Sequence, residues 1–106
     1  MTCLEMISVR TGSAMDAAKA LDICREISQS VQIAELLKID VYCNAAYPTD
    51  VSIHLHWKSD PGFWSILGRE VNAALGDLGL VSHTLWIEQE GSGICDMLEI
   101  GSKQVA

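Results

Sequence analysis

Two histidines and a serine occupy alternate positions of the segment Val51-Ser52-Ile53-His54-Leu55-His56-Trp57. Alternate side chains of a β-strand face opposite sides of the sheet, so Ser52, His54 and His56 share one face and the apolar residues share the other. Imidazole exchanges protons near neutral pH and also binds metals. The chemistry open to this strand depends on whether its polar face borders water or a cavity.

Two further polar residues, Asp40 and Tyr42, lie on a strand predicted at 37–43. If residues 45–50 form a regular connection, Tyr42 lies opposite His54 and Asp40 lies opposite His56. A carboxylate beside an imidazole orients the ring and raises its basicity, which yields a general base. We therefore predict Asp40, Tyr42, His54 and His56 as candidate catalytic residues. The alternative is a polar cross-strand ladder that only stabilises the hairpin.

Ser52 and Trp86 are the residues we predict to contact a ligand. Trp86 would form an apolar wall if it faces the same side as the histidines, and a core position is its alternative. A metal would need a third ligand beside the His-x-His pair. The remaining histidine, His83, alternates with Leu85 and Ile87, which places it on the other side of the sheet. We predict neither a metal nor a bound cofactor, since the sequence also lacks a glycine-rich phosphate loop.

The elements that would position these residues follow the order strand, helix, strand, strand, helix, strand. The strands are predicted at 3–10, 37–43, 51–57 and 82–89. The first helix follows Ser13 and Asp16, which resemble a capping box, and the second is expected between an N-cap at Asp60 and a C-cap at Gly79. This is the ferredoxin-like βαββαβ order of an α+β protein. It predicts a four-stranded antiparallel sheet with the first and third strands in the centre and both helices on one face.

The hairpin strands carry a clear apolar set that should face the helices. Its members are Leu37, Ile39, Val41, Cys43, Val51, Ile53, Leu55 and Trp57. Cys24 and Cys43 are expected to be buried free thiols.

The sequence of 106 residues forms one domain, 1–106, with a core at about 3–90. Residues 91–106 are predicted as a tail, within which 94–100 is a candidate short strand.

Composition excludes several kinds of partner. The net charge is −7, and the seven Lys and Arg residues are scattered singly. Nucleic-acid binding relies on clustered positive charge, so we expect no nucleic-acid partner. No apolar run has the length of a membrane span, and residues 1–9 do not form a secretory signal. We therefore expect a soluble cytoplasmic protein without a membrane partner.

The face of the sheet that the helices leave uncovered predicts self-association. The first strand shows at least two apolar residues there in either phase, and the last strand shows either Trp86 or Leu85 with Ile87. Soluble monomers rarely expose a large apolar patch. We therefore predict a homodimer formed through the open sheet face.

The element order, the element lengths and the Ser82-His83-Thr84-Leu85-Trp86 strand after a long helix resemble the dimeric α/β-barrel superfamily. Within it, residues 3–90 are similar to the antibiotic-biosynthesis-monooxygenase-like proteins. The resemblance implies two ferredoxin-like protomers whose sheets join into a barrel with the helices outside. Members include cofactor-free oxygenases, haem-degrading enzymes and lactone isomerases. No catalytic residue is carried over, because no family signature matches position by position.

Two functions follow from this resemblance. The first is binding of a small apolar or aromatic molecule between the sheets, with cofactor-independent monooxygenase-like chemistry. The alternative is a non-catalytic ligand-sensing or dimerisation module. An open space between the two sheets favours the first, and a space filled with side chains favours the second.

Overall fold

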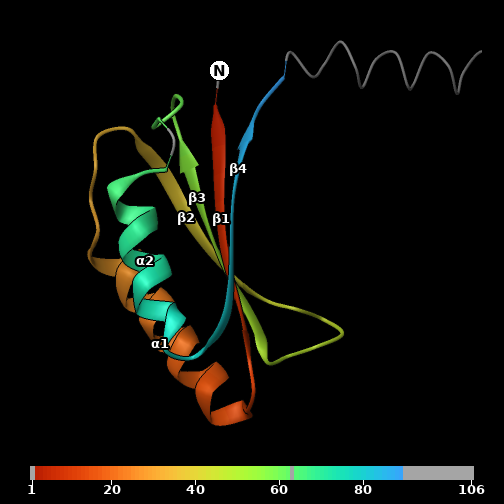
Figure 1. Ribbon diagram of the computed structural model, residues 1–106. Helices are drawn as coiled ribbons and strands as arrows, with labels where there is room; N and C mark the ends of the chain where they lie inside the picture. Colours follow the sequence, from red (N-terminus) through yellow and green to blue (C-terminus); the bar gives the residue numbers. More distant parts are fainter. Residues whose placement is uncertain (1, 63, 90–106) are drawn as a thin grey trace, which may run out of the picture.

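Two helices cover one side of a four-stranded antiparallel sheet, and the other side of the sheet is uncovered (Figure 1). The structure is a computed structural model and describes residues 2–62 and 64–89. Its elements are β1 (Cys3–Thr11), α1 (Ala14–Ser30), β2 (Leu36–Cys43), β3 (Asp50–Trp57), α2 (Ile66–Gly76) and β4 (Gly79–Ile87). The strand order is β2-β3-β1-β4, so the first and third strands are central as predicted. The ferredoxin-like fold is confirmed.

Strict alternation in the two central strands divides the sheet into a core face and an open face. The odd-numbered residues of β1 and β3 are buried against the helices. Helix α1 packs on them through a face of small residues, Ala17, Ala20 and Cys24. Helix α2 contributes Leu67, Val71 and Leu75 to the same core. The even-numbered side chains therefore project from the open face.

The cap of α1 is as predicted, and both predicted ends of α2 are wrong. Ser13 Oγ accepts a hydrogen bond from the Asp16 amide at 3.1 Å. Asp60 instead accepts from Gly62 N in a local turn, and the N-cap of α2 is Ser65. Gly79 is the first residue of β4 rather than a helix cap. A Cβ there would lie 2.8 Å from the Arg10 carbonyl carbon, so this strand start requires glycine.

The edge strand β2 departs from the predicted apolar set at both ends. A register shift between Leu36 and Lys38 turns Leu36 toward the core and leaves Leu37 exposed. Cys43, predicted to be buried, is exposed because β2 ends there and the chain continues into a loop that leads away from the helices (Figure 1). Cys24 is buried as predicted.

No helix among the described residues is long and apolar enough to cross a membrane. The predicted tail, its candidate strand at 94–100 and Cys95 lie outside the described residues.

Candidate functional site

The predicted site on the hairpin forms, but in a different register. Asp40 lies opposite His54, and Tyr42 lies opposite Ser52. The predicted pairs Tyr42 with His54 and Asp40 with His56 are therefore wrong as direct cross-strand neighbours. The turn explains the shift: the Asn44 amide donates a backbone hydrogen bond to Asp50, so Asp50 already belongs to β3 and the connection is shorter than the predicted 45–50.

The predicted partners nevertheless meet across the diagonal of the ladder. His56 Nε2 lies 3.0 Å from Asp40 Oδ2, an ion-pair distance without the geometry of a hydrogen bond. The rings of Tyr42 and His54 are 4.7 Å apart between centroids. Side chains lean along a strand, so diagonal neighbours are within reach of long residues. All four candidate catalytic residues are thus gathered on the open face.

Electrostatics favours the neutral form of one histidine of this cluster. Burial lowers the pKa of His54, the nearby His56 lowers it further, and Asp40 opposes both effects. His54 Nε2 shares a 2.6 Å hydrogen bond with Ser52 Oγ. For Asp40, partial burial acts to raise the pKa, but Lys38 and His56 outweigh it and hold the pKa below its usual value.

Trp86 lies on the open face and not in the core. It is 59% exposed, and on the sheet it pairs with Leu4, whose other neighbour is His56. These residues border a shallow groove of about 310 Å³ that also includes Leu37. The open face therefore combines an apolar end with the polar cluster of the hairpin.

A second polar cluster lies on the opposite, helix-covered side of the sheet and centres on Glu5. This carboxylate is 0% exposed, in the middle of the apolar core face of β1. A buried charge is costly unless hydrogen bonds replace its lost hydration. Its surroundings must therefore supply several donors.

Four groups bind the Glu5 carboxylate. Oε1 accepts from Trp57 Nε1 at 3.0 Å and from Ser65 Oγ at 2.6 Å. Oε2 accepts from the Ser65 amide at 3.3 Å and lies 2.6 Å from His83 Nε2. An ionised carboxylate is an acceptor only, and this arrangement of donors fits it.

The first turn of α2 is built around this carboxylate. Ser65 caps the helix by accepting from the Gly68 amide at 2.8 Å while its hydroxyl donates to Glu5. The positive end of the helix dipole thus points at a negative charge, which is favourable. A Cβ on Gly68 would lie 2.6 Å from Glu5 Cδ, so only glycine leaves room for the carboxylate here.

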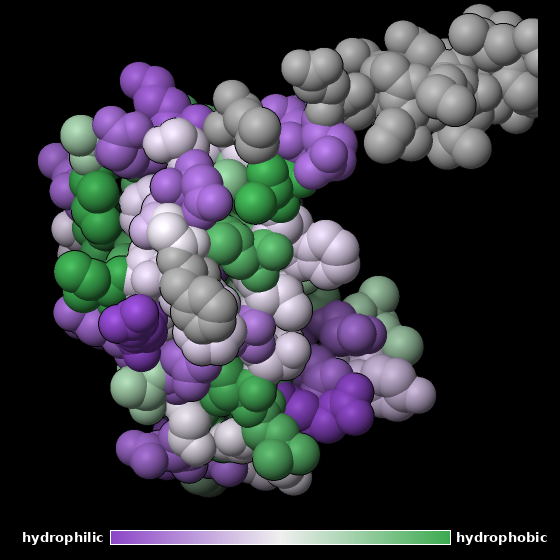
Figure 2. All heavy atoms as spheres, turned by 45° about the horizontal axis from the view of Figure 1, so that its top comes forward, coloured by the Kyte–Doolittle hydropathy of each residue, from purple (hydrophilic) through white to green (hydrophobic). Residues whose placement is uncertain are grey.

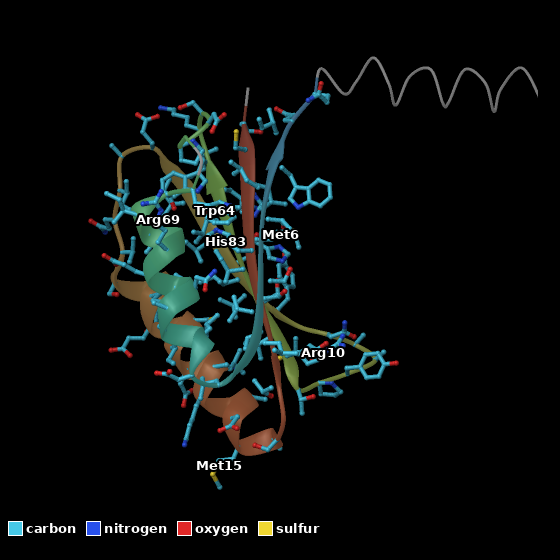
Figure 3. All side chains as sticks on the ribbon, in the orientation of Figure 1. Met6, Arg10, Met15, Trp64, Arg69 and His83 are labelled. Carbon is cyan, nitrogen blue, oxygen red and sulfur yellow. The ribbon has the colours of Figure 1, made fainter. Side chains whose placement is uncertain are left out.

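His83 connects this buried charge to the surface. Its side chain is 3% exposed, and its Nδ1 lies 3.3 Å from Asn72 Nδ2. The Trp64 indole stacks on its ring, with centroids 4.5 Å apart and an interplanar angle of 14°. Figure 3 places Trp64 and His83 beside α2, on the helix side of the sheet, whereas Met6 projects from the uncovered side.

A groove of about 370 Å³ lies over His83. Its lining residues are Trp64, Arg69, Asn72, Ala73 and His83. The position of His83 on the helix-facing side was predicted from its alternation with Leu85. Its role was missed, because Glu5 and Trp64 were not recognised as its partners. The signal in the sequence was a lone glutamate at a core-facing position of β1.

The Glu5–His83 pair has the geometry of an oriented base. Asn72 Nδ2 can only donate, so the Nδ1 it contacts is an acceptor and the proton lies on Nε2, directed at Glu5. A carboxylate that holds one ring nitrogen of a histidine fixes the tautomer and leaves the other nitrogen basic. The pair can therefore take up a proton at Nδ1. Among the described residues, no group of three His, Cys, Asp or Glu side chains has a metal-binding arrangement.

Comparison with solved structures identifies proteins of the same shape. One is a candidate antibiotic biosynthesis monooxygenase from Deinococcus radiodurans, with TM-score 0.65 and 19% identity over 84% of this chain and 93% of that one. Another is SnoaB, a cofactor-independent oxygenase from Streptomyces nogalater, with TM-score 0.56 and 10% identity over 83% and 93% of the two chains. A third is a dimeric protein of ferredoxin-like fold from Bacteroides fragilis, with TM-score 0.58 and 7% identity over 82% and 96%.

The chain shares the fold of these proteins. The resemblance in layout to antibiotic-biosynthesis-monooxygenase-like proteins is thereby confirmed at the level of the fold. No family model matches the sequence, and no curated protein matches it significantly. At such low identity the likeness carries over no substrate and no catalytic residue.

Proposed function

We propose that the protein binds a small aromatic molecule in the groove over His83 and removes a proton from it. The observation that carries this proposal is the fully buried Glu5 carboxylate, hydrogen-bonded to a histidine that lines an open groove. A core without the charge would be more easily stabilised, so a buried carboxylate–histidine pair at a groove favours a chemical role.

The walls of the groove support an aromatic ligand. Trp64 offers an indole that already stacks on one flat ring, that of His83, and Ala73 leaves space beside it. Aromatic rings prefer such offset or stacked partners. The hydrogen bond from Asn72 to His83 Nδ1 is long, at 3.3 Å, and an acidic hydrogen of the ligand can replace it.

Oxygenation is the reaction class that we propose for this proton transfer. SnoaB, which shares the fold, is a cofactor-independent oxygenase. In such a reaction the substrate itself must supply electrons to dioxygen, and loss of a proton makes an aromatic substrate more electron-rich. The protein then needs to supply only a base held next to the substrate. General bases typically accelerate proton transfer by about 10²–10⁴-fold.

Proton abstraction can be tested with 2-tetralone, a fused aromatic ketone with an acidic CH₂ group. In D₂O the wild-type protein should exchange this CH₂ hydrogen faster than buffer, as followed by NMR. His83→Asn should abolish the enhancement and Glu5→Gln should reduce it, with His56→Asn as the matched control on the other face of the sheet. Exchange that survives His83→Asn but is lost in His56→Asn would assign the chemistry to the hairpin cluster instead.

We also propose that the chain forms a homodimer through the uncovered sheet face. Leu80 is 79% exposed and Trp86 is 59% exposed on this face, and on the neighbouring strand β1 Leu4 lies opposite Trp86, with Met6 next along the same face. Figure 2 shows apolar residues exposed at several places on the surface between hydrophilic ones. The fold neighbour from Bacteroides fragilis is dimeric. In such a dimer the predicted residues around Ser52 and His54 would line the space between the sheets.

Light scattering tests the dimer with a matched pair of variants. Trp86→Glu should convert the wild-type dimer into a monomer, because it adds a charge to the proposed interface. Ile66→Glu is the control, since Ile66 is 77% exposed but lies on α2. A wild-type mass of one chain at micromolar concentration would exclude the dimer.

A further inference from the structure

The groove over His83 has one permanently charged side chain, Arg69, among its described lining residues. Arg69, Asn72 and Ala73 are spaced three and four residues apart and so share one face of α2. Trp64 lies before the helix and His83 on β4, so the groove has the arginine on one side and the stacked rings on the other. Figure 3 shows Arg69, Trp64 and His83 near one another at the same end of α2.

The guanidinium of Arg69 has no protein partner within the described part of the chain. It is exposed and forms no ion pair or side-chain hydrogen bond there. The protein has a net charge of −7, so acidic side chains that could pair with an arginine are plentiful. None of the five lining residues is acidic. The Glu5 carboxylate, which His83 contacts, is already bound by four groups.

We infer that Arg69 selects a planar aromatic ligand that carries an anionic group, a carboxylate or a phenolate. This inference rests on the proposed function and adds the substrate class. The aromatic part lies against Trp64 and Ala73, and the anionic group reaches Arg69. Arginine suits this role because its planar fork offers paired donors to a carboxylate and its charge does not depend on pH.

Charge and shape both contribute to this selectivity. Arg69 lies at the rim, where water and salt screen its field, so its effect on affinity is moderate. The buried negative charge of Glu5 makes the interior of the groove unfavourable for an anion. An anionic ligand is therefore held with its charge outward at Arg69 and its uncharged ring edge toward His83. Arg69 acts as a residue that determines specificity and orientation, and His83 as the one that meets the reacting hydrogen.

Naphthalene-2-carboxylate and naphthalene-2-carboxamide provide a matched pair of probes. They share ring and shape and differ in charge. Calorimetric titration of the wild-type chain should give an affinity about fivefold higher for the carboxylate, the effect of one partly exposed ion pair. In Arg69→Gln the two affinities should become equal. Arg25→Gln, which removes the same charge from an exposed position on α1, should behave as wild type.

Added salt gives an independent readout. Raising sodium chloride from 0.05 to 0.5 M should weaken binding of the carboxylate and leave binding of the carboxamide unchanged, because only the former uses a screened charge pair. Equal binding of both compounds to the wild type would overturn the role of Arg69 and leave the groove proposal intact. Failure of both compounds to bind would overturn the proposed function together with this inference.

Discussion

Replacing Gly68 with alanine tests the buried carboxylate directly. The new Cβ would lie 2.6 Å from Glu5 Cδ and closer still to Oε2. The Glu5 side chain must therefore move, and Oε2 loses the Ser65 amide and His83 Nε2. A hydrogen bond to a charged group contributes about 1.5–3 kcal/mol, so two such losses cost about 3–6 kcal/mol.

The same substitution also has a favourable term. Alanine is preferred over glycine inside a helix by about 1 kcal/mol. The expected net loss for Gly68→Ala is then about 2–5 kcal/mol in the free energy of unfolding. Gly76→Ala is the matched control, since apart from its chain neighbours and the backbone of the same helix no atom lies within 4 Å of a Cβ at that position. It should be neutral or stabilise by up to about 1 kcal/mol.

Urea denaturation followed by circular dichroism measures both variants against the wild type. A second readout is the Trp57 indole N–H, which donates to Glu5 at 3.0 Å and should shift in the NMR spectrum of Gly68→Ala. If Gly68→Ala is as stable as Gly76→Ala and the indole signal is unchanged, the carboxylate does not occupy the space beside α2. Glu5 would then not form the hydrogen bonds to Ser65 and Trp57 described above.

Three further predictions concern other parts of the chain. Ser65→Ala should lower the free energy of unfolding by about 2–4 kcal/mol, because it removes a helix cap and a donor to a buried charge, whereas Ser13→Ala removes a cap alone and should cost about 1 kcal/mol. Equal losses of the two variants in urea denaturation would contradict the double role of Ser65. Burial and a nearby histidine lower the pKa of His54 in the folded protein, so as pH falls below 6.5 the unfolded chain takes up a proton before the folded one does. The free energy of unfolding should therefore decline between pH 6.5 and the folded-state pKa. His54→Gln should flatten this decline, and an unchanged slope in the variant would contradict the lowered pKa of His54. Burial raises the pKa of the Cys24 thiol to about 11, whereas Cys43 is exposed. After brief alkylation at pH 8, mass-spectrometric mapping should therefore find Cys43 modified and Cys24 intact until urea is added. Modification of Cys24 before urea is added would contradict its burial.

The fold could be predicted because its signals are periodic and local. Alternation along β3 and three- to four-residue spacing in α1 correctly divide these elements into core and surface, whereas the mixed pattern of β1 left its phase open. The hairpin register depends on one turn, where the Asn44 side chain accepts from the amides of Ala46 and Tyr47. Such a turn shifts every cross-strand pair while leaving the faces unchanged, so the predicted partners meet on the diagonal of the ladder instead of directly opposite each other.

The Glu5 cluster could not be assembled from the sequence. Its partners Trp57, Ser65 and His83 are 52, 60 and 78 residues away from Glu5. A single charged residue inside an apolar strand interrupts the apolar pattern, but it does not indicate which donors compensate the buried charge. The antiparallel pairing of β1 with β3 and β4 brings Trp57 and His83 to this carboxylate, and the start of α2 brings Ser65. An unexplained charge at a core position is thus the sequence feature that points to such a site.

NMR chemical-shift mapping with naphthalene-2-carboxylate distinguishes the groove over His83 from the uncovered sheet face, because it locates the ligand on one side of the sheet or the other. We predict that the largest shifts fall on the Trp64 indole and the His83 imidazole, with little change at Trp86 and His54. Shifts confined to Trp86 and His54 would place the ligand on the uncovered sheet face and contradict the assignment of the site to the groove over His83.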